Sequence, residues 1–179
     1  MGNRLITIVD AIPNDVYVIR NIRKLTWLVT YPNKKFGISK KDIENKFPDD
    51  TTKIAKKKIE EGKRQFLDPT IHTYVAKEKN IIIGFCGVKK EEKNNRIGAI
   101  YLLPKYQNKG IGRKLMKMAM HWLGNERDIY VNVASYNEKA IRFYEKFGFV
   151  QTGKIVNDSA GVLPSGKIIP EIEMLLNHK

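Results

Sequence analysis

The feature that most restricts how this chain can fold is a passage from strand to helix over residues 100–115. An apolar run ends at Pro104, and a loop from Gln107 to Gly112 then leads into an amphipathic stretch. Apolar residues recur there every three or four positions, which predicts a helix over residues 110–123. We expect its buried stripe to consist of Ile111, Leu115, Met118, Ala119 and Trp122. A helix that begins directly beside the end of a strand argues against all-helical and all-β folds.

The first turn of such a helix is suited to binding an anion. Its backbone N–H groups have no partners inside the helix, and they carry the positive end of the helix dipole. Gly110 and Gly112 lack side chains, so a phosphate can come close to the backbone. Lys109, Arg113 and Lys114 add positive charge. The segment therefore predicts a pyrophosphate-binding loop, although a turn that needs glycine only for its geometry gives the same local pattern.

Two other phosphate-binding motifs are incomplete in this chain. A dinucleotide-binding fingerprint needs a third glycine, and Leu115 stands at that position. Residues 161–167 approach a P-loop, but Ile168 replaces the hydroxyl residue that holds magnesium, and a strand-like segment follows instead of a helix. Neither of these nucleotide-binding folds is therefore expected.

The segment before residue 70 has mainly helical periodicity. One face of a predicted helix over residues 15–29 carries Val16, Ile19, Ile22, Arg23 and Trp27. Ser39 and Asp42 resemble a capping box that opens a short helix to residue 47. A third, basic helix is expected over residues 51–66.

Strand-like patterns dominate the remainder of the chain. Strands are predicted at residues 5–10, 73–77, 81–89, 96–103, 129–134, 149–156 and 168–176, with a helix over 138–147 and a turn-rich loop over 157–166. This order predicts a mixed α/β fold, with an antiparallel N-terminal meander and a C-terminal half that contains a crossover. With 179 residues and neither a repeat nor a linker, one domain over residues 1–179 is expected.

Composition restricts the setting and the partners of the protein. The net charge is +14, from 33 basic and 19 acidic residues, which favours an anionic partner. The lysines are spread along the chain, so a dedicated nucleic-acid-binding arm is not expected. The single cysteine, Cys86, cannot form an internal disulfide, and this favours a reducing, cytoplasmic location. The apolar runs are too short to span a membrane, and the first residues do not resemble a signal peptide.

A second motif covers residues 137–149. Asn137 is a natural N-cap, and Gly148 stands where the following helix would end. The inward-facing stripe of this helix would consist of Ala140, Ile141, Phe143, Tyr144 and Phe147. Taken alone, the pattern describes an ordinary amphipathic helix with a packed tyrosine.

Together the two motifs resemble the GNAT superfamily of N-acetyltransferases. The first carries Gln107, Gly110, Ile111, Gly112 and Leu115 after a Tyr-Leu-x-Pro strand end, which matches the acetyl-CoA motif of that family. The resemblance implies a GNAT fold, with a mixed central sheet of about six to seven strands flanked by helices, and with two central strands that splay apart. It further implies a substrate side over residues 1–72 and an acetyl-CoA-binding core over residues 73–179.

The resemblance also assigns roles to single residues. Acetyl-CoA, as co-substrate, would contact the backbone of Ile100, Tyr101 and Leu102, the loop and helix start formed by Gln107, Asn108, Lys109, Gly110, Ile111, Gly112 and Arg113, and the side chains of Asn137 and Tyr144. Tyr144 would be catalytic and protonate the departing thiolate. Direct transfer of the acetyl group to an amine requires no metal.

The general base is missing from the pattern. Many relatives place a glutamate where Arg96 or Asn132 stands in this chain, and neither side chain can accept a proton at neutral pH. The base could then be a chain of water molecules, a carboxylate, or His72 from another segment. The sequence does not choose between these.

The acceptor is indicated by a shorter match. Residues 26–31, Thr-Trp-Leu-Val-Thr-Tyr, resemble the PaiA-type branch, whose members acetylate spermidine and spermine. Trp27 and Tyr31 would bind an alkylammonium group by cation–π contact, or simply pack the helix onto the sheet. A polyamine also needs nearby acids, and the candidates are Asp42, Glu44, Asp49 and Asp50.

Several alternatives remain open at this stage. The acceptor could be a protein or peptide amine instead of a small-molecule amine. The net charge and the missing base also fit a non-catalytic regulator that binds acetyl-CoA or nucleic acid. Strand edges near the C-terminus would allow a homodimer.

Overall fold

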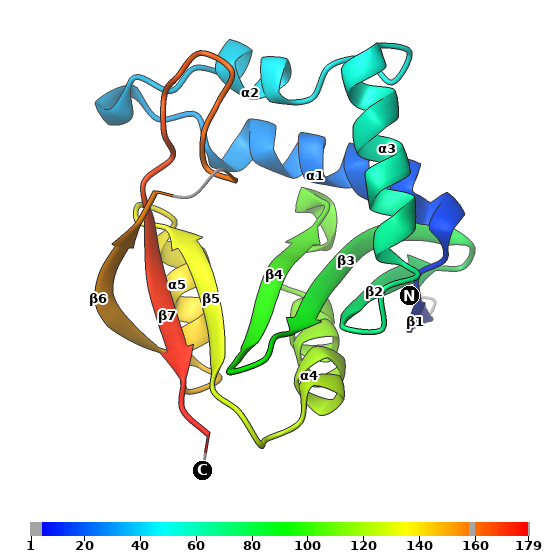
Figure 1. Cartoon of the computed structure of the whole chain (residues 1–179), viewed down its shortest axis with the longest axis vertical. Coiled ribbons are helices and arrows are strands. Elements are labelled where there is room, and N and C mark those ends of the chain that lie inside the picture. The colour runs from blue at the N-terminus through cyan, green and yellow to red at the C-terminus, as the bar shows by residue number, and fades with distance from the viewer. Residues whose placement is uncertain (1–4, 158–159, 179) are drawn as a thin grey trace.

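The computed structural model of the chain describes residues 5–157 and 160–178, and Figure 1 shows its architecture. The N-terminal part begins with a strand and three helices. The elements are β1 (Ile6–Asp10), α1 (Val16–Thr30), α2 (Lys40–Lys46), α3 (Lys53–Gln65), β2 (Ile71–Glu78), β3 (Ile81–Lys90), β4 (Asn95–Leu102), α4 (Ile111–Leu123), β5 (Ile129–Ala134), α5 (Glu138–Glu145), β6 (Val150–Val156) and β7 (Glu171–Leu176). This order confirms the predicted mixed α/β fold.

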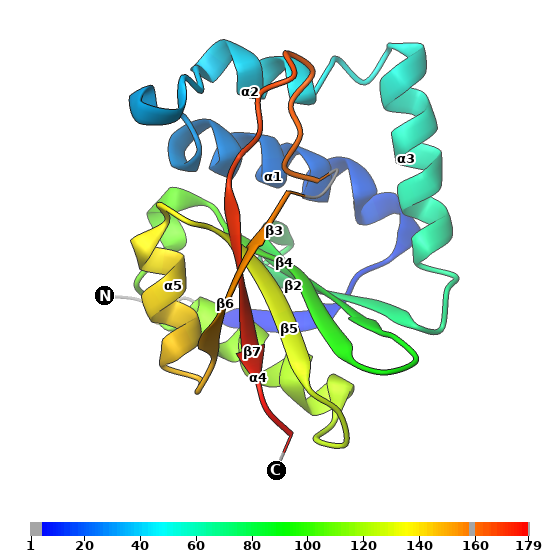
Figure 2. The same cartoon turned by 60° about the vertical axis from the view of Figure 1, so that its left-hand side comes forward.

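All seven strands belong to one sheet with the order β1-β2-β3-β4-β5-β7-β6. Strands β2 to β4 form the predicted antiparallel meander, and β1 pairs antiparallel with β2 from Ile6–Glu78 to Asp10–Tyr74. The pair β4–β5 is parallel, and β7 lies antiparallel between β5 and β6. Figure 2 shows β5, β6 and β7 crossing in front of the meander strands as one twisted group.

The central strands β4 and β5 separate after a short stretch of pairing. Their register runs only from Asn95–Ile129 to Ile97–Val131. Beyond it, β4 stays paired with β3 as far as Leu102, and β5 stays paired with β7 as far as Ala134. The facing edges of residues 98–102 and 132–134 therefore have no strand partner across the gap. This confirms the splayed central strands.

Two groups of helices cover the two faces of the sheet. Helices α4 and α5 pack on one face, around a cluster that includes Leu115, Met116, Val131 and Tyr144. Helix α1 packs on the other face over Val75 and Phe85, and α2 joins it beside residues 163–169. Figure 1 shows α1, α2 and α3 together above the sheet, with α4 and α5 below them on its other side.

The predicted stripe of α4 was partly wrong. Ile111, Leu115 and Ala119 are buried as expected, but Met116 is also fully buried, whereas Met118 is 37% exposed. Trp122 is half-buried at the edge, where its ring stacks on His72. Because both flanks of this helix are apolar, the sequence periodicity could not show which flank faces the sheet.

The last predicted strand also begins later than expected. Residue 168 forms only an isolated bridge to Val162, and β7 starts at Glu171. Pro170 has no N–H group to donate to a strand ladder, which accounts for the delay. Residues 158 and 159 of the predicted loop lie outside the described residues. Among the residues that are described, no helix has the length and apolar character needed to cross a membrane.

Candidate active site

The N-terminus of α4 has the properties of an anion-binding turn. Gly110 is its N-cap with a φ of +77°, a conformation that favours glycine, and no side chain caps the helix there. The first helical hydrogen bond runs from the Lys114 N–H to the Gly110 carbonyl. The N–H groups of residues 111–113 therefore point out of the helix without an intrahelical acceptor. Lys109, Arg113 and Lys114 are exposed around this turn.

The fold leaves room for a side-chain Cβ atom at Gly112. A Cβ atom at Gly112 would lie 3.5 Å from side-chain atoms of Leu102 and Phe143, which is ordinary van der Waals contact. The fold itself therefore does not require glycine at this position. A ligand that lies on the backbone would require it, so the residues present fit the phosphate-bearing group that the sequence predicts.

The loop before α4 is tied to the end of β4. The Gln107 side-chain Nε2 donates to the Leu102 carbonyl over 3.1 Å, and Asn108 has a left-handed φ of 60°. The Tyr106 hydroxyl donates to Glu78 over 2.7 Å. These bonds hold the loop beside Ile100, Tyr101 and Leu102, the segment of β4 that faces the gap. The structure thus places the predicted cofactor-binding loop and the first turn of α4 against the end of β4.

Helix α5 packs on the same face of the sheet as α4, and its tyrosine is buried in the cluster there. Asn137 caps the helix, with its Oδ1 accepting from the Ala140 N–H over 3.2 Å, which confirms the predicted N-cap. Tyr144 is 4% exposed, and burial raises its pKa well above the usual value, with smaller contributions from Cys86 and Tyr101. The Tyr144 hydroxyl therefore stays protonated throughout the physiological pH range.

On the opposite face of the sheet, three aromatic residues share hydrogen bonds. Trp27 Nε1 donates to the Tyr101 hydroxyl over 2.9 Å, and the hydroxyls of Tyr101 and Tyr31 are 3.1 Å apart. Trp27 and Tyr31 are 9% and 7% exposed, so packing accounts for most of their surface. Tyr101 connects this group to β4, because it is also one of the residues that face the gap.

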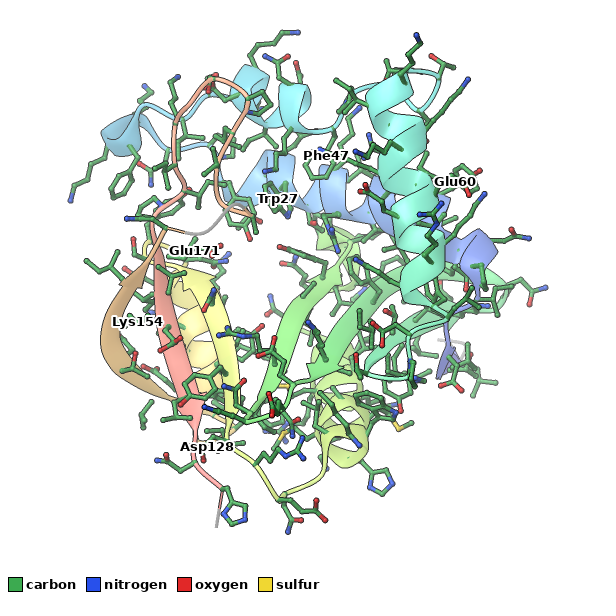
Figure 3. All side chains as sticks on the ribbon, viewed as in Figure 1. Trp27, Phe47, Glu60, Asp128, Lys154 and Glu171 are labelled. Atoms are coloured by element: carbon green, nitrogen blue, oxygen red, sulfur yellow. The ribbon has the colours of Figure 1, made fainter. Side chains whose placement is uncertain are left out.

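The sequence interpretation did not single out Glu171, the first residue of β7. Burial raises the pKa of Tyr31, Tyr101 and Tyr136, that of Tyr136 to about 12, and the Glu171 carboxylate adds to each increase. Figure 3 shows Glu171 at the end of β7 that faces α1, the helix carrying Trp27. A signal was available in the sequence: an acidic residue directly after Pro170, where a strand must begin.

Arg96 and Asn132 stand at the usual glutamate positions, and His72 was the candidate base from another segment. Arg96 lies in the paired part of β4, 3.4 Å from Glu91, and Asn132 is an amide. His72 lies in β2 and is 3.0 Å from Asp10, with its ring against Trp122. Cys86 is fully buried, and burial raises its thiol pKa to about 12, so it is no nucleophile at neutral pH. Glu171 is therefore the carboxylate that the structure adds to the list of candidate bases.

The four acids predicted to surround a polyamine have other partners. Asp42 accepts a hydrogen bond from Lys167 Nζ over 2.8 Å, and together with the N-cap Ser39 it forms the capping box of α2. Asp50 is 2.7 Å from Arg20, Glu44 is 3.6 Å from Lys41, and Asp49 accepts from Thr51. Each of these acids therefore has a partner within the described residues, and their role beside a polyamine stays a prediction.

Comparison with known proteins decides the family. The model of the acetyltransferase (GNAT) family matches residues 20–149, more than half of the chain and a range that contains both motifs. The chain belongs to the GNAT family. The family and fold predicted from the two motifs are thereby confirmed.

Relatives of known function match shorter segments. The spermidine N(1)-acetyltransferase of Vibrio cholerae is 37% identical over 62 residues, which are 33% of this chain and 36% of that protein. The spermine/spermidine N(1)-acetyltransferase of Bacillus subtilis is 31% identical over 71 residues, 37% of this chain and 47% of that protein. The chain thus matches between about a third and a half of the length of these curated relatives.

Solved structures match nearly the whole GNAT chain. The PaiA N-acetyltransferase of Thermoplasma acidophilum, in complex with coenzyme A, has a TM-score of 0.72 at 21% identity, and the match covers 97% of this chain and 99% of that one. A mutant of the SpeG spermidine N-acetyltransferase of Vibrio cholerae has a TM-score of 0.67 at 20% identity, covering 97% and 94%. At these identities the similarity establishes the fold alone. The PaiA structure is among these neighbours, as the resemblance predicted.

Proposed function

We propose that this protein transfers the acetyl group of acetyl-CoA to a primary amine by direct attack. The observation that carries the proposal is the parting of β4 from β5 directly beside the uncapped N-terminus of α4. The open edges of the two strands suit an extended, amide-containing arm, and the α4 turn suits a pyrophosphate. The division into a substrate side over residues 1–72 and an acetyl-CoA-binding core over residues 73–179, within one domain, is part of the same proposal.

In this proposal, different residues of the chain bind successive parts of the acetyl-CoA molecule. The backbone of Ile100 to Leu102 binds the pantetheine arm, and an N–H there polarises the thioester carbonyl. Residues 107–113 hold the pyrophosphate, and Asn137 contacts the arm from the opposite side of the gap.

The transfer itself needs one proton donor and one acceptor. The amine nitrogen forms a bond to the carbonyl carbon, and the carbon–sulfur bond breaks. Tyr144, which is protonated at neutral pH, donates to the departing thiolate. The proton lost by the amine goes to water or to a carboxylate, for which Glu171 is the candidate beside the tyrosine hydroxyls.

A polyamine is the acceptor that the relatives favour, because the matching proteins are named for spermidine and spermine. Trp27 and Tyr31 would line the acceptor side, with Tyr101 between them and the gap. Glu171 would attract the ammonium group. The cytoplasmic location and a homodimer stay predictions from the sequence.

The test is a thiol-release assay with acetyl-CoA and a panel of amines that includes spermidine, spermine and a lysine-containing peptide. We expect thiol release to depend on the amine and to be fastest with a polyamine. Release with the peptide alone would move the acceptor class to proteins. If no amine in the panel releases thiol from acetyl-CoA, the proposed activity is wrong.

A further inference from the structure

A cavity of about 470 Å³ lies between α1, α3 and the β3–β4 part of the sheet. Its inner walls are largely apolar, with Val16, Ile19, Phe47 and Phe85 among them. Figure 3 shows Phe47 above α1, near the upper part of α3. The cavity also reaches Gly98 and Ala99, the first residues of β4 beyond its pairing with β5, so it lies beside the acceptor side of the gap.

The charged groups around this cavity are mostly positive. Five cationic side chains line it and one acid, Glu61; the cations are Arg20, Arg23, Lys46, Lys58 and Lys89. Glu61 lies 3.9 Å from Lys57, which is outside the cavity, whereas Arg20 is neutralised by Asp50 and Lys89 lies 3.7 Å from Glu91. The remaining balance is positive, which opposes an ammonium ion and favours an anion.

Arg23 is a half-buried cation of this cavity. Its Nε atom is buried and has no hydrogen-bond partner within residues 5–157 and 160–178. Its guanidinium lies 5.5 Å from the centre of the Phe85 ring, a contact that leaves the in-plane N–H groups to face other acceptors. A buried, charged N–H group without an acceptor is costly, and an anion bound to the rest of the guanidinium from the cavity would offset part of that cost through its charge.

We propose that this cavity is an anion-binding site, which takes a carboxylate on a short apolar chain and binds it through Arg23. The apolar walls receive the chain, and the exposed Lys58 at the rim adds long-range attraction. The carboxylate has two sources: it is part of the acceptor amine itself, or it belongs to a separate molecule that binds beside the acceptor. The site does not depend on the proposed acetyl transfer, because binding requires neither acetyl-CoA nor turnover.

Trp27 lines the cavity and serves as an intrinsic probe. The chain has two tryptophans, so Trp122→Phe leaves Trp27 as the sole tryptophan. In that background we would titrate hexanoate, hexanamide and hexylamine and follow the Trp27 emission. Hexanoate is expected to give a saturable change at a concentration at least about tenfold lower than the other two. Equal responses to hexanoate and hexanamide would overturn the proposal.

Two further variants test the residues. Arg23→Gln, in the same background, is expected to weaken hexanoate binding by at least about tenfold, and unchanged affinity would remove Arg23 from the site. Arg23 is partly buried, so its substitution could also affect folding. Lys58 is exposed on α3, and Lys58→Gln should preserve the fold. We expect it to weaken hexanoate binding by about twofold to fivefold at low salt. Lys56→Gln on the same helix does not line the cavity and is the matched control. Equal affinity in both lysine variants would contradict the proposed rim.

Rate measurements then identify the source of the anion. If the acceptor carries it, 6-aminohexanoate should be acetylated with a kcat/KM at least about tenfold above that of hexylamine, and Arg23→Gln should abolish this preference. If a separate molecule carries it, hexanoate should change the rate of spermidine acetylation in the parent protein but not in Arg23→Gln. Absence of all acetylation would refute the proposed function and leave the Trp27 titration as the measure of the anion site.

Discussion

The region proposed to bind the acetyl donor and the region proposed to bind the acceptor are assembled from the chain in different ways. The donor region consists of β4, the loop to α4, α4, β5 and α5, which follow one another over residues 95–145. The acceptor region consists of α1, α2, α3 and residues 160–171, and it closes only through contacts between distant segments. Trp27 and Tyr101, for example, are joined by a hydrogen bond across 74 positions of the sequence.

The difference lies in the type of group that carries the chemistry. In the donor region the groups are mainly backbone N–H groups, and glycine and capping residues position them locally. In the acceptor region they are side chains whose neighbours depend on the tertiary fold, such as Arg23 beside Phe85 or Asp42 beside Lys167. A local sequence motif can therefore predict the ligand of a backbone turn. A site made of side chains can be predicted only when the folded structure shows which side chains are neighbours.

The largest expected effect tests the proton donor of the donor region. Tyr144→Phe removes the hydroxyl but keeps the ring that packs against Phe143 and Phe149. We expect kcat to fall by about a hundredfold, as is common when a general acid is lost, with little change in the affinity for CoA. Steady-state rates and calorimetric titration with CoA would measure the two effects separately. Tyr130→Phe, a half-buried tyrosine of β5, is the control; a kcat equal to that of the parent in Tyr144→Phe would remove this residue from the mechanism.

The next prediction tests the backbone turn. Gly112→Ala adds a methyl group that makes only ordinary contact with Leu102 and Phe143, so the fold should be preserved. The same methyl group would stand where a phosphate approaches, so CoA affinity should fall by about tenfold while the thermal midpoint stays within a few degrees. Unchanged affinity in a folded variant would mean that glycine serves only the geometry of the turn.

A third prediction tests the role of Glu171 in the acceptor region. Glu171→Gln keeps the size of the side chain and removes the charge beside Tyr31, Tyr101 and Tyr136. We expect kcat/KM for the amine to fall by about tenfold, with KM for acetyl-CoA unchanged, because an ammonium ion loses its counter-charge. Glu138→Gln, on the exposed side of α5, is the matched control. A loss confined to the acetyl-CoA KM would place Glu171 on the donor side instead.

The same division explains how far the sequence could predict the structure. The strand at residues 129–134 was predicted with the same bounds as in the structure, and the capping box at Ser39 and the N-cap at Asn137 are confirmed, because each depends on adjacent residues. Met116 and Met118 were assigned to the wrong sides of α4, since two apolar flanks give the same period. The sequence interpretation did not single out Glu171 and did not show that Asp42 pairs with Lys167, because both observations depend on partners that lie far away in the sequence.

Arg23 illustrates an intermediate case. Its place among the apolar residues of α1 was visible in the sequence, as one charge on an otherwise inward-facing row. The pattern alone gave no reason for that charge. Only the cavity and the position of the guanidinium over Phe85 relate it to a ligand.

The smallest expected effect concerns the ion pair between Lys167 and Asp42, which joins two segments of the acceptor region. Lys167, on the loop before β7, donates to Asp42 at the start of α2, and with Ser39 this holds the pKa of the Asp42 carboxyl well below its usual range. A folded-state pKa below the unfolded value of about 4 contributes stability at higher pH, and that stability is lost as the pH falls below about 4. Asp42→Asn should therefore lower the thermal midpoint by a few degrees at pH 7, and the difference from the parent should shrink below pH 4 in a series of melting curves. Glu44→Gln, which removes an exposed acid of the same helix, should show no such pH-dependent difference. If the Asp42→Asn difference stayed constant down to pH 2, the contribution of this pair would be packing and not charge.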